Sequence, residues 1–388
     1  MKSNSSLKSG STIGIIGGGQ LGRMLAIAAR QIGYKTVVLD PDVNCPAGQV
    51  VDKQIVEPYS SRNASLELAR LSDVITYEFE NVDAGSVADA SEIVNVYPSP
   101  AVLRTTQHRL REKNALLKAG ISVAQFREVR SIQELYAAGK DLSYPMVLKT
   151  ATEGYDGKGQ LIISNAEEIG QSYESLSSRG TDLIVEKFIP FKMEISAICA
   201  RTSDGQTTTF PPSENIHRNH ILDMSIVPPR LPKSLTDKAR LLAENVAVKL
   251  DVVGLIAVEM FVTEEDELLV NELAPRPHNS GHYSMGGCDI SQFEQLARVM
   301  AGLPISNPTL LCPTVMVNLL GEIWEDTDGE PDWAGALSFP GVSLHLYGKA
   351  EPRTGRKMGH INVVADTIED ALYIANESRA RAWRRSTP

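Results

Sequence analysis

The amino-acid sequence predicts a mixed fold, α/β at its N-terminus and α+β beyond it, in two or three domains. Residues 12–39 follow the order strand, glycine-rich turn, helix, strand, which is the pattern of a βαβ unit in a parallel sheet. Later segments such as 144–149 and 255–262 are short aliphatic runs bounded by turn residues, as in buried strands. The 388 residues, 42% of them hydrophobic, suffice for more than one core.

Composition argues against several classes of function. The net charge of −10 disfavours general binding to nucleic acid or to an anionic membrane, so bound phosphates need locally placed basic residues. Cys45, Cys199, Cys288 and Cys312 form no C-x-x-C pair, which argues against a zinc site and a disulfide framework and fits a reducing cytoplasm. No run of about 18 apolar residues occurs and the first ten residues lack the apolar core of a signal peptide, so we expect a cytoplasmic protein.

The first glycine-rich turn is a candidate phosphate site. The glycines of segment 17–22 satisfy G-x-G-x-x-G, and Asp40 lies where a dinucleotide-binding protein holds a ribose hydroxyl. Three interpretations stay open: a dinucleotide site, a phosphate site for another ligand at the helix N-terminus, and close packing alone. A further strand, 74–77, ends at Glu78, on the edge where open α/β sheets bind ligands, with a solvated loop as the alternative.

A second glycine-rich segment follows a strand that ends in Lys149. Its three glycines, between strands 144–149 and 161–163, allow the backbone to fold over a polyanion and to offer it amide donors. No Walker pattern occurs, so ATP would lie under a strand-loop-strand flap; a bare hairpin loop is the alternative. The flap consists of Gly154, Tyr155, Asp156, Gly157, Lys158, Gly159 and Gln160.

Strand 183–189 is a candidate adenine site. Its backbone can read the edge of an adenine ring while Phe188 and Ile189 cover the ring. Glu194, on the next strand, is a candidate for holding ribose hydroxyls, and a surface carboxylate at a sheet edge is the alternative.

Other basic and titratable groups are less specific. Helix 101–119 carries Arg104, Arg109, Arg111 and Lys113, for which a solvated face is the ordinary interpretation. His217 lies in a polar segment, where a lone histidine is more often structural or solvated. The C-terminal hairpin concentrates positive charge that can hold a phosphate of a second substrate, with a solvated loop as the alternative; its residues are Lys349, Arg356 and Lys357.

An acidic hairpin carries the strongest indication of chemistry. If residues 264–267 form its turn, Thr263 faces Leu268 and Glu259 faces Glu272. Like charges directly opposite each other destabilise a sheet, so this pair suggests a shared cation, and carboxylate oxygens suit Mg²⁺. Glutamates that point to solvent or pair with lysines are the alternative. The chain next supplies a cation, a titratable group and an amide, namely Arg276, His278 and Asn279.

Together these motifs resemble the N5-carboxyaminoimidazole ribonucleotide synthetase family, ATP-grasp enzymes of purine biosynthesis. The resemblance covers nearly the whole chain and is carried by segments 17–24, 154–160, 186–187, 258–261, 271–282 and 355–360. It implies an N-terminal αβ domain over residues 1–105 and a small C-terminal α/β domain over 306–388. Between them it implies an ATP-grasp domain over 106–305, with lobes at about 106–185 and 186–305.

The resemblance also implies roles for individual residues. ATP would contact Arg109, Lys149, the flap 154–160, Glu186, Lys187, Phe188, Ile189, Glu194, His217, Asn271 and Glu272. Glu259 and Glu272 would hold Mg²⁺, and the catalytic residues would be Arg276, His278 and Tyr155. The ribonucleotide would contact Gln20, Leu21, Glu78, Asn279, Lys349, Arg356 and Lys357.

The implied reaction joins ATP, bicarbonate and 5-aminoimidazole ribonucleotide to give N5-carboxyaminoimidazole ribonucleotide, ADP and phosphate through carboxyphosphate. A homodimer is the usual assembly. Arg276 and His278 would stabilise carboxyphosphate while Tyr155 keeps out water. Three alternatives are an ATP-grasp formate or amino-acid ligase acting on a related ribonucleotide, a dinucleotide-dependent oxidoreductase that uses segment 17–22 and Asp40, and a non-catalytic nucleotide-binding protein.

Overall fold

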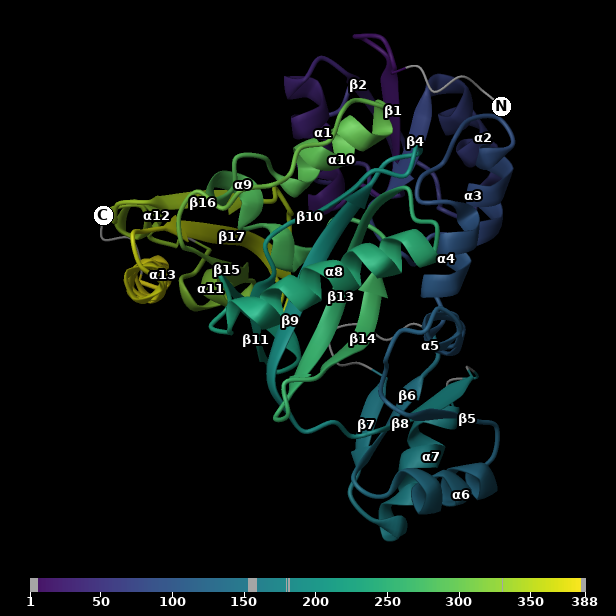
Figure 1. The fold of residues 1–388 in the computed structure, drawn as a ribbon. Helices are drawn as coiled ribbons and strands as arrows, with labels where there is room; N and C mark the ends of the chain where they lie inside the picture. Colours follow the sequence, from purple (N-terminus) through teal and green to yellow (C-terminus); the bar gives the residue numbers. More distant parts are fainter. Residues whose placement is uncertain (1–5, 153–158, 179, 181, 330, 385–388) are drawn as a thin grey trace.

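The structure is a computed structural model in which residues 6–152, 159–178, 180, 182–329 and 331–384 are described. Within these residues the strands form three sheets, and helices pack against them (Figure 1). The N-terminal sheet is parallel and the other two are antiparallel, which confirms the mixed α/β and α+β fold predicted from the sequence.

The N-terminal sheet has the order β3-β2-β1-β4, with parallel neighbours throughout. Helix α1 covers one face, and α2 with α3 covers the other, so the strands are buried on both sides. Because α1 connects β1 to β2, the predicted βαβ unit is confirmed. The bounds are β1 Thr12–Ile16, α1 Gln20–Gln31, β2 Lys35–Leu39, β3 Lys53–Ile55, α2 Arg62–Leu71, β4 Val74–Tyr77 and α3 Ala84–Ser91.

The continuous helix predicted over 101–119 is wrong, because two contacts interrupt it. The Gln107 side chain donates to two backbone carbonyls of loop 80–82, at 2.6 and 2.7 Å. The backbone N–H of Arg109 donates to the carbonyl of Ala151 at 2.9 Å instead of continuing a helix. Arg109 therefore opens a new helix beside the small lobe. The two helices are α4 Pro100–Thr106 and α5 Arg109–Lys118.

A small antiparallel lobe follows, with the strand order β5-β8-β6-β7. Two helices pack on it around a core that includes Leu135, Leu148 and Val185. In Figure 1 this lobe lies apart from the larger body, below the ends of β13 and β14. Its elements are β5 Phe126–Val129, α6 Ile132–Leu142, β6 Met146–Thr150, β7 Gln160–Ile163, η1 Ala166–Glu168, α7 Ile169–Ser177 and β8 Leu183–Lys187.

The largest sheet has nine strands in the order β14-β13-β9-β11-β12-β15-β17-β16, with β10 paired to β9. It runs without interruption across residues 305 and 306, because β12 pairs with β15. The predicted domain boundaries stay predictions. The strands are β9 Phe191–Arg201, β10 Thr207–Thr209, β11 Ser213–Arg218, β12 Ile221–Val227, β13 Gly254–Thr263, β14 Leu268–Ala274, β15 Thr314–Leu320, β16 Val342–Leu346 and β17 Lys357–Val364.

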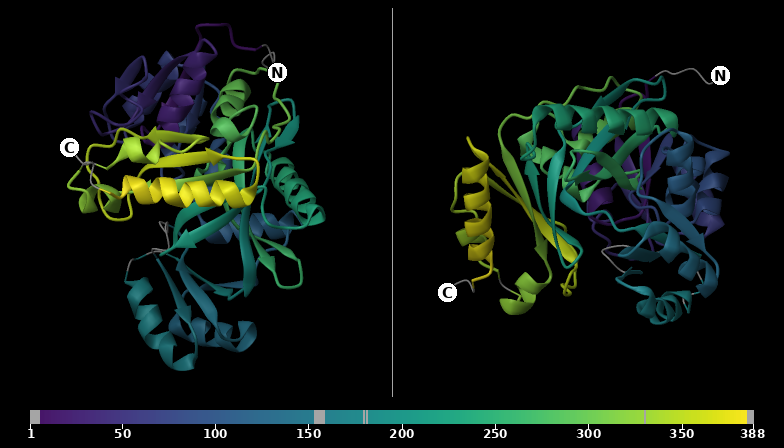
Figure 2. Two further views of the ribbon diagram at one scale, coloured as in Figure 1. Left: turned by 90° about the vertical axis from the view of Figure 1, so that its left-hand side faces the viewer. Right: turned by 60° about the horizontal axis from the view of Figure 1, so that its bottom comes forward.

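Helices cover this sheet along its length, as Figure 2 shows for the C-terminal helix α13, which runs alongside the strands at one end of the sheet. Helix α8 buries small side chains, among them Ala239 and Ala243, against β9 and β13. Among the described residues, no helix combines the length and the apolar character that a membrane span requires. The helices are α8 Lys233–Lys249, η2 Asn279–Gly281, α9 Ser284–Gly287, α10 Gln292–Met300, α11 Glu322–Asp326, α12 Trp333–Ala336 and α13 Ile368–Ala382.

The acidic hairpin β13–β14 has the predicted pairing of Glu259 with Glu272, but a different turn. Val262 and not Thr263 pairs with Leu268, so the predicted turn 264–267 is wrong. Thr263 closes the turn by donating its N–H to the carbonyl of Glu267 at 3.0 Å. A bulge beside Glu259 then restores the register, because the β14 strand carries one extra residue there. The bulge therefore brings the two carboxylates opposite each other.

Three histidine rings stack where the end of the large sheet meets segment 278–285. The ring of His360 lies between those of His345 and His282, with centroid distances of 4.5 and 4.6 Å. His360 and His282 are fully buried. Burial is the largest effect that lowers the pKa of both rings, and the neighbouring histidines lower it further. The two buried rings are therefore neutral in the folded protein.

This burial predicts a loss of stability in mild acid. The unfolded chain binds protons at histidine near pH 6.5, whereas the folded chain binds them only at lower pH. The stability that comes from the neutral rings should be fully present above about pH 6.5, and the free energy of unfolding should fall as the pH drops below that value. In His360→Gln this dependence should be shallower, measured by denaturant unfolding at several pH values. The exposed His220→Gln is the control, and equal slopes in the two variants would contradict the assignment.

Candidate functional site

A cleft of about 860 Å³ lies between the small lobe and the large sheet. Strands β6 and β8 supply one wall, and β9, β11, β13 and β14 supply the other. The structure brings together many of the residues predicted from the sequence. Those that line the cleft are Arg109, Lys149, Gln160, Glu186, Lys187, Phe188, Ile189, Glu194, His217, Glu259, Asn271, Glu272, Arg276, His278, Asn279 and Lys357.

Glu259 and Glu272 face the cleft from adjacent strands and carry opposite pKa shifts. Burial raises the pKa of Glu259, but His278, whose Nε2 lies 3.0 Å from Glu259 Oε1, outweighs it and brings the pKa to about 2. The pKa of Glu272 is raised, first by burial and further by the charge of Glu259. Its nearest cation, Arg109 Nη2, lies 3.8 Å away. The repulsion between the two carboxylates is therefore only partly offset.

This pair fits a hard divalent cation better than a soft one. Both candidate ligands are carboxylates, the oxygen donors that Mg²⁺ prefers, and both keep exposed surface in the cleft, 25% and 43% of their side chains. Within the described ranges, no group of three or more His, Cys, Asp or Glu residues could hold a metal ion. Within these ranges a cation at the pair would therefore have two carboxylates and no third side chain of these four types.

Glu80 fixes the guanidinium of Arg276. Arg276 Nη2 donates to Glu80 Oε1 at 2.9 Å, and Arg276 Nε donates to Glu80 Oε2, so the pair is bidentate. Burial raises the pKa of Glu80, but the charge of Arg276 outweighs burial and lowers it overall. From the sequence, Glu80 is a candidate only as one of the carboxylates that follow strand 74–77, and its pairing with Arg276 is not predicted. Its position just after strand 74–77, beside Glu78, was the available signal.

The backbone of His278 is held from α10. Gln292 Oε1 accepts the N–H of His278 at 2.9 Å, and Gln292 Nε2 donates to its carbonyl at 2.8 Å. The next residue, Asn279, lines the cleft, and both polar atoms of its buried side chain lack a hydrogen-bond partner among the described residues. An unpaired buried amide is costly, so Asn279 is ready to bind a ligand group.

A buried lysine, Lys113, and a partly buried one, Lys149, share the carboxylate of Glu186. Lys149 Nζ lies 3.0 Å from one oxygen and Lys113 Nζ lies 3.3 Å from the other. Lys113 is 1% exposed, so the solvated face expected for it is wrong. Burial raises the pKa of Glu186, but the two lysines outweigh burial and lower it. The Glu186 side chain serves this charge cluster, which leaves only its backbone for the predicted contact with adenine.

The other predicted nucleotide contacts are distributed along the same wall. His217 Nδ1 lies 2.7 Å from Glu194 Oε2; burial lowers the pKa of His217, but the hydrogen bond to Glu194 and its charge raise it overall. Phe191 and Phe261, which were not predicted, stack with centroids 4.5 Å apart and line the cleft next to Phe188. Of the flap, Gly154, Tyr155, Asp156, Gly157 and Lys158 lie outside the described residues, whereas Gly159 and Gln160 are described.

The start of α1 is occupied by carboxylates of the protein itself. Glu78 accepts the N–H groups of Gly19 and, at 2.7 Å, of Gly22, and burial raises its pKa. Asp40 accepts the N–H of Gly18 at 2.6 Å and the hydroxyl of Tyr59 at 2.6 Å. Asp40 is thus committed within the protein, which argues against the dinucleotide interpretation of this turn.

Several predicted substrate contacts lie beside the cleft and do not line it. Lys349 donates to the carbonyl of Lys357 at 2.7 Å and lies close enough to Glu78 to lower its pKa in part. Arg356 donates to the carbonyl of Glu351 within its own turn. The predicted contacts that do not line the cleft are Gln20, Leu21, Glu78, Lys349 and Arg356.

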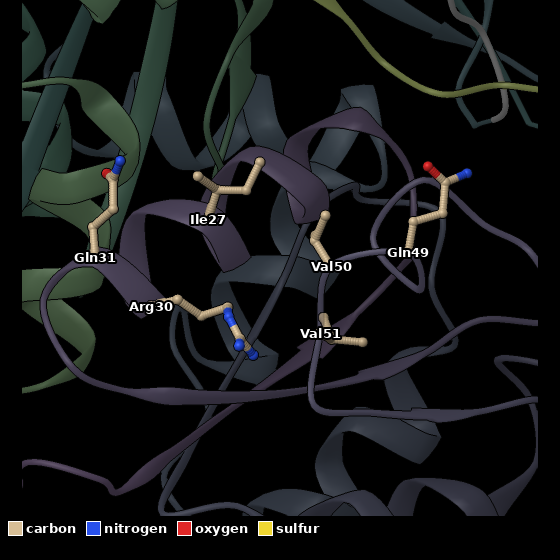
Figure 3. A pocket seen from close by; sticks show the side chains of 6 residues that line it. All are labelled: Ile27, Arg30, Gln31, Gln49, Val50 and Val51. Atoms are coloured by element: carbon tan, nitrogen blue, oxygen red, sulfur yellow. The ribbon is translucent and has the colours of Figure 1, made fainter.

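A second hollow, of about 630 Å³, lies on the outer side of α1 (Figure 3). Apolar and polar side chains mix in it, and its one charged side chain, Arg30, pairs with Asp52 at 2.8 Å. It lacks the converging charged groups of the cleft, which is therefore the candidate active site. Its lining residues are Ile27, Arg30, Gln31, Gln49, Val50 and Val51.

Because two lysines share the carboxylate of Glu186, we expect Glu186→Gln to lower the stability of the protein. Removing this charge leaves Lys113, which is buried, and Lys149, which is partly buried, without their shared anion, so the free energy of unfolding should fall by roughly 3 kcal/mol. Adding Lys113→Met removes one of the two charges and should restore part of the loss, measured by denaturant unfolding without nucleotide. Glu67→Gln, which breaks the exposed pair with Lys53, is the control and should cost less than about 1 kcal/mol. Wild-type stability in Glu186→Gln would refute the cluster.

Models of known domains match three segments of the chain. They are a ribonucleotide synthetase preATP-grasp domain over residues 10–107, an ATP-grasp domain over 114–293 and a phosphoribosylaminoimidazole carboxylase C-terminal domain over 314–373. A protein from Bacillus subtilis, an N5-carboxyaminoimidazole ribonucleotide synthase, is 47% identical over 352 residues, which cover 91% of each chain.

Solved structures agree with this similarity. An ADP complex of an N5-carboxyaminoimidazole ribonucleotide synthetase superposes with a TM-score of 0.91 at 45% identity, covering 97% of this chain and 98% of that one. An enzyme from Aspergillus clavatus in complex with ADP and 5-aminoimidazole ribonucleotide superposes with a TM-score of 0.89 at 32% identity, covering 96% of this chain and 99% of that one.

Proposed function

Because the chain belongs to the N5-carboxyaminoimidazole ribonucleotide synthase family and is an ATP-dependent ligase, we propose that it carboxylates 5-aminoimidazole ribonucleotide with bicarbonate. The products are N5-carboxyaminoimidazole ribonucleotide, ADP and phosphate, in de novo purine biosynthesis. The observation that carries the proposal is the pair Glu259 and Glu272, opposite each other in the cleft beside Arg276, His278 and Asn279.

The cleft has the charges that the first step needs. Bicarbonate and the terminal phosphate of ATP are both anions, so their approach requires positive charge that is already in place. Glu259 and Glu272 would hold Mg²⁺, which supplies charge neutralisation at the phosphates. Lys149 lines the same cleft on the opposite wall. Arg276, fixed by Glu80, presents a rigid guanidinium for the bicarbonate.

The proposed chemistry runs in two steps. An oxygen of bicarbonate attacks the γ-phosphorus, the bond to ADP breaks, and carboxyphosphate forms. Carboxyphosphate then breaks into CO₂ and phosphate, and the exocyclic amine of the ribonucleotide adds to CO₂ and loses a proton. Arg276 and His278 line the cleft where carboxyphosphate would form, and they would hold it until the amine is in place. The protein's part is therefore to position two anions and to keep water from the intermediate.

The acceptor side of the cleft suits an uncharged amine. Asn279 offers a donor and an acceptor without charge, and Lys357 lies nearby for a phosphate. Both oxygens of the Glu78 carboxylate already accept hydrogen bonds from backbone N–H groups at the start of α1. Glu78 can therefore contact a ribose hydroxyl only through a lone pair that these bonds leave unused. Homodimer assembly and a cytoplasmic location stay predictions from the family resemblance.

ADP release tests the proposal directly. With ATP and Mg²⁺, release should depend on bicarbonate and be stimulated by 5-aminoimidazole ribonucleotide, measured by a coupled ADP assay together with detection of the carboxylated product. Release that ignores the ribonucleotide would exclude this substrate.

Glu272→Gln tests the carboxylate pair. The change keeps the shape of the side chain but removes one charge that would hold the cation, so turnover should fall by at least about a hundredfold. The matched control is Glu265→Gln, which neutralises an exposed carboxylate in the turn of the same hairpin and should leave the rate unchanged. Equal rates in the two variants would remove Glu272 from the site.

A further inference from the structure

A network of buried hydroxyls lies behind His278, away from the cleft. Ser280 Oγ lies 2.8 Å from His278 Nδ1 and 2.6 Å from Ser196 Oγ. Asn215 on β11 bonds to Ser196, and the hydroxyls of Ser213 and Ser225 bond to Asn215. Ser280 is fully buried, and Ser196 and Asn215 are 2% and 6% exposed, so bulk water does not reach these groups.

Around Asn215 the network has a direction. The hydroxyls of Ser213 and Ser225 donate to Asn215 Oδ1 at 3.1 and 3.0 Å, and the amide nitrogen of Asn215 donates to Ser196 Oγ at 3.0 Å. The Ser196 hydroxyl lies within hydrogen-bond distance of two others, Ser280 Oγ at 2.6 Å and Ser213 Oγ at 3.0 Å. Ser280 can accept from Ser196 and donate its own proton to His278 Nδ1.

His278 Nδ1 receives a second donor that cannot reverse. The backbone N–H of Ser280 points at the same nitrogen at 3.4 Å. With two donors directed at it, Nδ1 carries a lone pair, and the ring proton is on Nε2. Nε2 lies 3.0 Å from Oε1 of Glu259, and a carboxylate favours a protonated nitrogen beside it. The partners on both sides of the ring thus select the same tautomer.

We propose that Ser280 is a positioning residue that holds His278 as the tautomer protonated on Nε2. His278 is then a hydrogen-bond donor toward the cleft and not a base, because its lone pair points into the buried network. In this structure the group beside Nε2 is Glu259; that an oxygen of bicarbonate or of carboxyphosphate would receive the proton once Glu259 holds a cation rests on the proposed function. The donors at Nδ1 do not depend on what Glu259 binds.

Nitrogen NMR reads the tautomer without any turnover. In enzyme labelled with ¹⁵N-histidine, the His278 signals are those that disappear in His278→Asn. We expect an unprotonated Nδ1 and a protonated Nε2, in the presence and absence of Mg²⁺ and ADP. A proton on Nδ1 would overturn the proposal, whether or not the enzyme carboxylates the ribonucleotide and whether or not any Ser280 variant folds.

Ser280→Ala tests the part played by the hydroxyl. It should move the His278 signals toward a mixture of tautomers and lower kcat about tenfold, the effect of losing about one hydrogen bond, while KM for ATP changes less than about twofold. Ser378→Ala is the matched control, because it removes an equally buried hydroxyl that donates to Ala336 O at 2.8 Å far from the cleft. Unchanged His278 signals in Ser280→Ala, or a loss of kcat equal to that of the control, would overturn the assignment.

Discussion

The repulsion between Glu259 and Glu272 is the constraint on which the rest of the site depends. Two carboxylates opposite each other on neighbouring strands cost free energy unless a positive charge lies between them. The protein offsets this cost only in part: the polar Nε2 of His278 lies 3.0 Å from one carboxylate, and the charge of Arg109 lies 3.8 Å from the other. Because the repulsion between the two carboxylates is only partly offset, the pair still attracts a cation that binds together with a nucleotide.

The surrounding elements hold the segment that faces this pair. Glu80, from the N-terminal sheet, fixes Arg276, and Gln292, from α10, fixes the backbone of His278. Asn362 on β17 donates to the carbonyls of His282 and Met285 at 2.8 and 2.9 Å, so the C-terminal strands also support this segment. Rigid support of this kind lets a site present charge without reorganisation during reaction.

The sequence predicts what is local. Glycines, aliphatic runs and the block 271–282 identify the βαβ unit, and together with the family resemblance they identify about half of the residues that line the cleft. The pairing of Glu259 with Glu272 was predicted from a turn that is wrong. The pairing is nevertheless correct, because the bulge in β14 compensates for the one-residue shift at the turn. Turn and bulge are each set by hydrogen bonds that side-chain alternation does not encode.

Long-range contacts decided the features that the sequence did not predict. The helix over 101–119 breaks because Gln107 and Arg109 bond to distant carbonyls. Lys113 is buried because Glu186, from another strand, neutralises it. Glu78 accepts hydrogen bonds from the start of α1, whereas Glu80 pairs with Arg276. The sequence shows two carboxylates two positions apart, but it does not show which of them contacts Arg276.

Crystals grown with ADP and Mn²⁺ test the central claim most directly, because the anomalous scattering of manganese locates the ion without reference to the protein. We expect a single strong peak between the carboxylates of Glu259 and Glu272, within bonding distance of both and of a phosphate oxygen. A peak elsewhere in the cleft, or full nucleotide density with no peak between the two carboxylates, would contradict the account.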